Sequence, residues 1–182
     1  MHERAAQWSE LVSLDEELER EFELRLTECS TLAFRVAFSV LRHREDAEDV
    51  AQEAFAKAYR SFRQLRNRER FRAWLVRMTW RMALDRQRAD RRRFRREDVV
   101  RPPDAVTPQV ESDERGQMLW QAIDTLSEKL RVVIVLAAIE GYDIKEVAAL
   151  LELPEGTVKS RLFLARQQLK ESLPWMARSG TR

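Results

Sequence analysis

The sequence has few of the residues on which disulfide-bonded proteins and most enzymes depend. Cys29 is its only cysteine, so no internal disulfide can form, and a cysteine-based metal site is disfavoured. His2 and His43 are its only histidines, and neither a glycine-rich phosphate loop nor a Ser/His/Asp spacing occurs. Acidic pairs such as Asp46 and Asp49 share a helix but lack convergent metal-binding partners. We therefore expect no catalytic activity, no metal and no cofactor.

Long apolar runs are also missing. No segment approaches the roughly 20 apolar residues that cross a bilayer, and the first residues contain no apolar core of a secretion signal. These features predict a cytoplasmic protein without membrane insertion. Only four glycines and five prolines interrupt the chain, which favours long helices over a turn-rich β fold. Cys29 is expected to pack as a small apolar residue on a helix.

The net charge is only +2, but the charges are strongly segregated along the chain. Residues 60–96 hold fifteen arginines against three acidic residues, and residues 97–128 hold eight acidic residues against two arginines. From Gly156 to the end, six basic residues face one acidic residue. Two basic stretches separated by an acidic one indicate two places that meet a polyanion.

Apolar residues recur at spacings of three and four in both halves, and no segment alternates for long enough to form a strand. The fold class is therefore all-α. Three prolines, Pro102, Pro103 and Pro108, place a flexible linker over residues 95–113. In the first half, one helix is expected to break near Arg42. A later helix has an apolar face of Phe71, Leu75, Met78 and Met82 and is expected to continue into the arginine cluster. In the second half, four helices are predicted at about 115–126, 128–140, 144–151 and 157–172.

The segment 142–162 is typical of a helix-turn-helix. Asp143 can cap a helix, and Glu146 three residues later completes a capping box. Residues 153–156 form the turn, and Thr157 is expected to cap the second helix. The first turns of such a helix enter the major groove of DNA, although a two-helix hairpin with a solvated cationic face is an alternative. We predict duplex-DNA contacts by the outward residues Thr157, Lys159, Ser160, Arg161, Phe163 and Arg166.

Two further segments narrow the interpretation. Residues 44–55 place carboxylates and an amide on an exposed helical face, and residues 71–78 lead into the arginine-rich segment 84–93. Together with the helix-turn-helix, in this order and spacing, the chain resembles bacterial RNA polymerase sigma factors of the extracytoplasmic-function (group 4) type. The resemblance covers about residues 20–93 and 115–173. It implies two helical domains, sigma domain 2 at 20–94 and sigma domain 4 at 114–174, with an extension at 1–19, a linker at 95–113 and a tail at 175–182.

The resemblance implies that the chain binds core RNA polymerase and directs it to promoters by recognising −10 and −35 elements and promoting DNA melting. Asp49, Gln52 and Glu53 match the helix that docks on the clamp helices of the β′ subunit, where a solvated acidic face is the plain alternative. Domain 4 is expected to meet the β flap and the −35 element through the helix-turn-helix residues named above. An anti-sigma protein is the expected regulator.

For the −10 element, the resemblance assigns Arg66, Asn67 and Arg68 to the loop that holds a flipped base. The surface for the separated strand is expected to include Phe71, Trp74, Arg77, Arg81 and Arg88. Opening DNA needs an aromatic group to replace lost stacking and cations to hold the backbone, and Trp74 beside Arg77 supplies both. A core position for Trp74 is the alternative.

The chain departs from the family pattern at several positions. Ser127 replaces a usual proline at a helix start, and serine is a good cap. Glu152 stands where glycine is usual in the helix-turn-helix turn; a positive φ there costs about 1 kcal/mol. Leu164 follows Phe163 where a basic pair is common, so the −35 preference is expected to differ. Arg42 occupies a turn that usually holds glycine.

A conventional helix-turn-helix repressor or activator, binding duplex DNA as a dimer, is the competing hypothesis. It predicts a dimerisation or ligand domain, and it leaves the first 93 residues without a role. Binding to core polymerase distinguishes the two.

Overall fold

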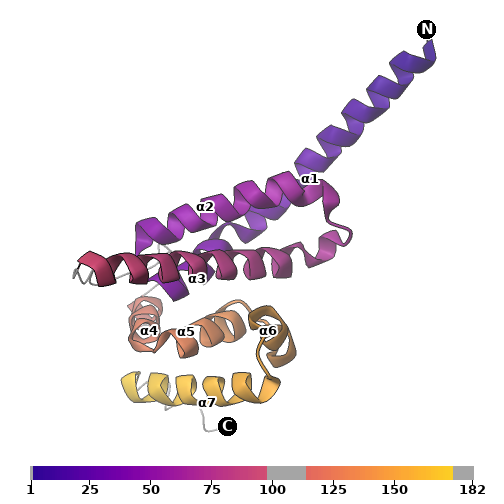
Figure 1. The fold of residues 1–182 in the computed structure, drawn as a ribbon. Helices are drawn as coiled ribbons and strands as arrows, with labels where there is room; N and C mark the ends of the chain where they lie inside the picture. Colours follow the sequence, from indigo (N-terminus) through magenta and orange to yellow (C-terminus); the bar gives the residue numbers. More distant parts are fainter. Residues whose placement is uncertain (1, 98–113, 174–182) are drawn as a thin grey trace, which may run out of the picture.

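The computed structural model describes the backbone of residues 2–97 and 114–173, and the side chains of residues 16–93 and 114–173. Within these ranges every regular element is a helix, which confirms the all-α prediction. The helices form two units, one on each side of residues 98–113 (Figure 1). The core of the predicted linker lies outside the described residues, although the preceding helix continues to Glu97, past the predicted linker start.

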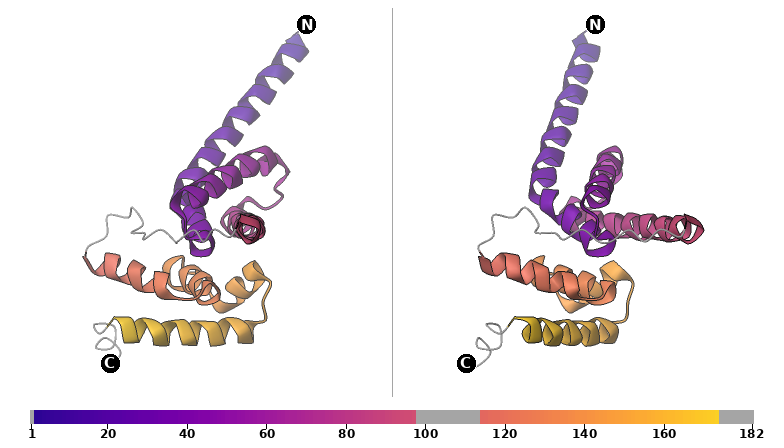
Figure 2. Two further views of the ribbon diagram at one scale, coloured as in Figure 1. Left: turned by 60° about the vertical axis from the view of Figure 1, so that its left-hand side comes forward. Right: turned by 90° about the vertical axis from the view of Figure 1, so that its left-hand side faces the viewer.

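The N-terminal unit contains three long helices, α1 (His2–Leu41), α2 (Arg44–Ser61) and α3 (Phe71–Glu97). Two single turns, η1 (Phe62–Gln64) and η2 (Arg68–Arg70), connect α2 to α3. The first part of α1 projects away from both units as a straight helix (Figures 1 and 2). The rest of α1 packs against α2 and α3 and supplies much of the buried core.

The break after α1 occurs at Arg42, as the sequence predicts. Arg42 has a φ of 58°, in the left-handed region, and its N–H donates to the Phe38 carbonyl at 3.0 Å. This bond satisfies one of the carbonyls that a helix end leaves open. The next helix begins two residues later, so the strained residue lets α1 and α2 fold back on each other.

An aromatic cluster fills the N-terminal core. The rings of Phe22, Phe62 and Phe71 meet edge to face, with centroids 5.2 to 6.0 Å apart. Such pairs add stabilisation beyond the apolar area that they bury. Cys29 is 2% exposed on the inner face of α1, which confirms its predicted role as a small apolar residue. The cluster joins α1, η1 and the start of α3, so it also fixes where α3 begins.

The C-terminal unit contains α4 (Glu114–Thr125), α5 (Glu128–Ile134), α6 (Ile144–Leu151) and α7 (Glu155–Ser172). A single π turn, η3 (Val135–Ile139), extends α5, so α5 and η3 together match the helix predicted at 128–140. Ser127 is the N-cap residue of α5, although its side chain makes no capping hydrogen bond. All four predicted C-terminal helices are therefore confirmed.

The helices α6 and α7 form the predicted helix-turn-helix. Asp143 accepts from the Glu146 N–H at 2.8 Å, and the Glu146 carboxylate accepts from the Asp143 N–H at 2.8 Å, which confirms the capping box. Glu152 ends α6 with φ 56° and ψ 45°, the left-handed conformation anticipated for this position. The prediction of Thr157 as the cap of α7 is wrong. The helix begins at Glu155, and Pro154 is its N-cap residue, with an extended ψ of 141° and no side-chain capping hydrogen bond.

The two units pack against each other. In both views of Figure 2, α4, α5 and α6 lie between the N-terminal unit and α7, which is the outermost layer. Arg131 of α5 is buried at the contact and donates to the carbonyls of Ser39 in α1 and Leu126 at 3.0 and 2.7 Å. Burial lowers the pKa of Arg131 to about 10, so its guanidinium stays charged at neutral pH.

Candidate nucleic-acid interface

The outer face of α7 carries the residues predicted to read duplex DNA. Lys159, Ser160, Phe163 and Arg166 are exposed, while Thr157 and Arg161 are partly buried. The inner face is closed by Val158, Leu162, Ala165 and Leu169. Figure 1 shows α7 as the helical layer farthest from the N-terminal unit, and the outer residues of this helix are exposed within the described part of the chain.

Two apolar side chains interrupt the cationic character of this face. Phe163 is 69% exposed and Leu164 is 48% exposed. Single exposed apolar side chains are common on protein surfaces, and the major groove of DNA offers thymine methyl groups that such side chains can contact. The departure of Leu164 from the family pattern therefore lies on the surface, beside the residues predicted to contact DNA.

The predicted base-holding loop lies between η1 and η2. Arg66 and Asn67 are exposed there. Arg68 is partly buried instead, because its guanidinium pairs with the Glu21 carboxylate of α1 and lies 5.4 Å from the centre of the Phe62 ring. Arg66 and Asn67 are therefore accessible at the surface, whereas Arg68 links the loop to α1 through its ion pair with Glu21.

One face of α3 brings together most of the other residues predicted for the −10 element. Trp74, Arg77, Arg81 and Arg88 are separated by three, four and seven residues, spacings that place side chains on the same side of a helix. Arg77, Arg81 and Arg88, here called the arginine stripe, are exposed. Trp74 is partly buried and packs against Phe71, with ring centroids 5.9 Å apart, so it has both a core contact and an open edge.

Phe71 is not a surface residue, and its predicted contact with the separated strand is wrong for this structure. The ring is 0% exposed and packs against Phe22 and Phe62. Phe71 and Leu75 lie four residues apart on the apolar face of their helix, a periodicity that is compatible with burial but does not decide it. Phe71 therefore holds the start of α3 in place, and Trp74 is the aromatic residue next to the stripe.

Contacts across the two units were not anticipated from the sequence. Arg77 donates to the Ala149 carbonyl of α6 at 3.2 Å, and Arg81 pairs with the Glu152 carboxylate. A carboxylate from Glu140 is held by Arg35 of α1 and Arg72 of α3. No local pattern reveals such pairs, because 71 to 105 residues separate most of the partners.

On α2, Asp49, Gln52 and Glu53 are all exposed and lie within four residues of one another. Spacings of three and four put them on one helical face, here called the acid–amide row. The buried residues Val50, Ala51 and Ala54 anchor the opposite face of α2 in the core. The row can therefore meet a cationic partner as a rigid unit.

The described residues show no other obvious chemical centre. Within residues 16–93 and 114–173, no three His, Cys, Asp or Glu side chains gather closely enough to hold a metal ion. No helix in the part of the chain that the structure describes has the length and apolar character needed to cross a membrane.

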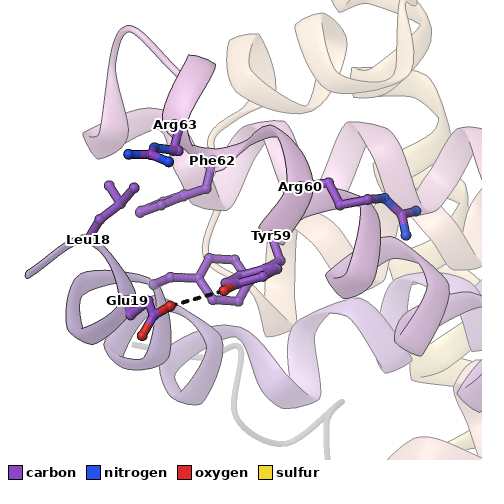
Figure 3. Close-up of a pocket in the computed structure, with 7 residues that line it drawn as sticks. Leu18, Glu19, Tyr59, Arg60, Phe62 and Arg63 are labelled. Atoms are coloured by element: carbon purple, nitrogen blue, oxygen red, sulfur yellow. Dashed lines mark hydrogen bonds between the residues drawn. The ribbon is translucent and has the colours of Figure 1, made fainter. Parts of the chain in front are cut away.

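A hollow of about 280 Å³ lies between α1 and the end of α2 (Figure 3). The Tyr59 hydroxyl crosses it and donates to the Glu19 carboxylate at 3.4 Å. No residue predicted from the sequence to bind DNA or polymerase lines this hollow. Its walls are formed by Leu18, Glu19, Phe22, Tyr59, Arg60, Phe62 and Arg63.

Comparison with known sequences matches both units. The family model for Sigma-70 region 2 matches residues 26–93, and that for Sigma-70 region 4 matches residues 116–169. The chain is 33% identical over 143 residues to the ECF RNA polymerase sigma-E factor of Haemophilus influenzae, covering 71% of this chain and 76% of the relative. It is 36% identical over 147 residues to the ECF RNA polymerase sigma factor SigE of Mycolicibacterium smegmatis, covering 77% of this chain and 56% of that longer relative.

Comparison with solved structures gives the same family. The sigma factor RpoE from Bartonella quintana, crystallised with the anti-sigma factor NepR, matches with a TM-score of 0.75 and 25% identity, over 85% of this chain and 98% of that chain. CnrH in complex with the cytosolic domain of CnrY matches with a TM-score of 0.58 and 26% identity, over 86% and 89%. On sequence and fold together, the chain belongs to the extracytoplasmic-function (ECF) family of RNA polymerase sigma factors.

Proposed function

We propose that this sigma factor binds the β′ clamp helices of core RNA polymerase through the acid–amide row on α2 and directs the enzyme to promoters. The observation that carries the proposal is the exposure of Asp49, Gln52 and Glu53 on one rigid face, in a chain that also has a helix-turn-helix. A simple helix-turn-helix repressor has no need of such a face. The exposed carboxylates complement a basic partner helix.

At the promoter, the two units take different parts of the DNA. The outer face of α7 enters the major groove of the −35 element, with domain 4 against the β flap. Arg66 and Asn67 hold a flipped base of the −10 element, and Trp74 with the arginine stripe holds the separated strand. The arginine side chains of the stripe neutralise phosphates of the separated DNA strand. The Trp74 indole ring replaces the base stacking that is lost when the duplex opens.

The protein contributes no catalytic step of its own and acts in the cytoplasm, where RNA polymerase is found. An anti-sigma protein is the proposed regulator. The support is the relationship to RpoE of Bartonella quintana and to CnrH, whose structures contain an anti-sigma factor and the cytosolic domain of CnrY.

The proposal is tested by assembling the full chain with core polymerase and measuring co-elution and promoter-directed transcription on a genomic library. Asp49→Lys and Glu53→Lys are expected to abolish co-elution, because they reverse the charge of the row. Glu23→Lys, an equal charge change at an exposed position on α1, is the matched control and is expected to retain binding. If the wild-type chain fails to bind core polymerase, the proposed function is wrong.

A further inference from the structure

The loop that carries Arg66 and Asn67 has little support from its own backbone. It consists of residues 65–67 and connects η1 to η2, two turns of three residues each. The Leu65 N–H donates to the Phe62 carbonyl at 3.1 Å. The Arg70 N–H donates to the Asn67 carbonyl at 3.3 Å, but the Asn67 side chain makes no capping hydrogen bond to η2. Because 3₁₀ turns have poorer hydrogen-bond geometry than α-helices, contacts from other elements decide where the loop lies.

Two contacts hold the ends of this loop. Before the loop, the Phe62 ring is buried, points toward α1 (Figure 3) and meets the Phe22 ring edge to face, with centroids 5.2 Å apart. After the loop, the Arg68 guanidinium donates to the Glu21 carboxylate of α1 at 2.5 Å. The same guanidinium lies 5.4 Å from the centre of the Phe62 ring. Arg68 therefore joins the far end of the loop both to α1 and to the apolar anchor at the near end.

Glu21 is a fixed point for this contact, because its helix is anchored in the core. The neighbouring Phe22 is buried and packs against rings from η1 and from the start of α3. One turn further along α1, the Arg25 guanidinium lies 3.9 Å from the Glu21 carboxylate. Glu21 and Arg68 are 47 residues apart in the sequence, so the pair joins the loop to a different helix. A movement of the loop relative to α1 would break the pair.

Glu21 itself has the wrong charge to hold the DNA backbone. A carboxylate repels phosphates, whereas Arg66 and Asn67 are exposed and can donate hydrogen bonds to a base. The Glu21 and Arg68 side chains are 30% and 42% exposed, so water partly screens their attraction. A partly exposed ion pair and a cation–π contact together change an equilibrium by about three- to tenfold. Loss of the pair should therefore release the loop in a measurable fraction of molecules while the core stays folded.

We propose that Glu21 is a positioning residue for recognition of the −10 element. Through Arg68, it holds the loop in the orientation in which Arg66 and Asn67 receive a flipped base. It therefore sets how strongly the sigma–polymerase holoenzyme distinguishes that base, whereas the arginine stripe holds the strand backbone. The proposal rests on the proposed function, which assigns the loop to the flipped base. Affinity for the base falls in proportion to the fraction of molecules that have the loop in place.

The test compares the wild-type chain with Glu21→Gln, Arg68→Met and the double variant, each assembled with core polymerase. Glutamine keeps the size of Glu21 and removes its charge. Methionine keeps an unbranched apolar stem beside Phe62 and removes the guanidinium. Glu23→Gln is the matched control, because Glu23 is exposed on the same helix and the substitution removes the same charge. The control is expected to behave as wild type in every measurement.

The measurement is the fluorescence anisotropy of two labelled single strands that contain the −10 element mapped by the transcription assay. One strand is intact, and the other is abasic at the position where removal of the base costs the wild-type holoenzyme the most affinity. The ratio of the intact-strand affinity to the abasic-strand affinity should be about three- to tenfold smaller for Glu21→Gln than for wild type. Affinity for the abasic strand should stay within about twofold of wild type, because the phosphate contacts are unchanged.

The double variant completes the test, because Glu21 and Arg68 are expected to act through one contact. Its affinity ratio should be no smaller than the smaller of the two single-variant ratios. Additive losses would show that Arg68 acts on DNA separately and would overturn the proposal.

Equal affinity ratios for wild type and Glu21→Gln would also overturn the proposal, and so would an equal loss on the intact and abasic strands. If the wild-type holoenzyme shows no preference for the intact strand, the assignment of the loop to a flipped base fails and the proposal fails with it. If wild type has that preference and Glu21→Gln retains it in full, only the role of Glu21 is refuted.

Discussion

The turn after α1 allows backbone strain to be measured separately from side-chain contacts. Arg42 has a φ of 58°, where the Cβ of an L-residue crowds its own backbone and costs about 1 to 2 kcal/mol. Glycine has no Cβ and avoids that cost. We expect Arg42→Gly to unfold at a higher temperature than Arg42→Ala, although both variants lose the same guanidinium.

The expected difference in stability between these two variants is about 1 kcal/mol, because the looser unfolded state of glycine offsets part of the relieved strain. For a chain of this size that corresponds to about 2 to 4 °C in Tm. Both variants also lose the Arg42 charge, which repels Arg131 and attracts Asp124, so the difference between glycine and alanine isolates the backbone strain. Differential scanning calorimetry at neutral pH measures the shifts.

The control is the same pair of substitutions at Lys57, an exposed residue inside α2. In a right-handed helix alanine is the better residue by about 0.5 to 1 kcal/mol. The sign of the glycine–alanine difference should therefore reverse between the two positions. If Arg42→Ala is as stable as Arg42→Gly, or more stable, the strain argument is refuted.

Three further predictions follow from the site and the core. Replacing thymine with uracil in the mapped −35 element should weaken binding by the wild-type chain about three- to fourfold, which is the worth of one methyl contact. If uracil weakens binding by Phe163→Ala to the same extent, Phe163 does not contact the thymine methyl group. Arg166→Ala should lower the salt slope on duplex DNA by about 0.9; an unchanged slope would show that it meets no phosphate. Burial raises the pKa of Asp124 from 3.8, despite the opposing effects of Arg42 and Arg131. The folded state therefore disfavours the charged form of Asp124. The free energy of unfolding decreases as the pH rises from 3.8 through the pKa that Asp124 has in the folded state. Asp124→Asn should consequently be more stable than wild type at pH 7, and urea titrations should show the gain disappearing as the pH falls toward 4; destabilisation at pH 7 would contradict this.

Local chemistry explains why most helix boundaries could be predicted from the sequence. The capping box of Asp143 and Glu146 involves residues three apart, so its geometry is decided within one turn of chain. The break at Arg42 and the left-handed Glu152 are local in the same sense. The start of α7 was misplaced by two residues because threonine is a favoured N-cap type, whereas the helix in the structure begins after Pro154, which is not.

Exposure was harder to predict than helicity. Phe71 belongs both to an apolar periodicity and to a motif associated with DNA, and the sequence does not say which role governs its ring. The structure decides it through Phe22 and Phe62, which come from other helices. Arg68 is withdrawn in the same way by Glu21 of α1. Both outcomes depend on tertiary packing, which local spacing does not encode.

The charge pattern predicted a polyanion for the arginine-rich segment, but it did not reveal the carboxylates that engage the same arginines. Glu140 and Glu152 lie 68 and 71 residues from the α3 arginines that they contact, so no local pattern pairs them. Folding brings them to Arg72 and Arg81 by packing one unit on the other. Segregated charge therefore predicts where a polyanion would bind, and only the fold shows which carboxylates contact the same segment.

Arg42 and Glu152 are the two non-glycine residues with positive φ among residues 2–97 and 114–173. Each costs about 1 kcal/mol that glycine would avoid, and the Glu152 carboxylate also makes an ion-pair contact. For Glu152 the contact is the Arg81 guanidinium, and the exposed pair offsets at most about that cost. The pair and the strain at Glu152 therefore roughly cancel. Arg42→Gly should be more stable than Arg42→Ala, whereas Glu152→Gly should leave stability nearly unchanged, because it removes the strain and the exposed ion pair together.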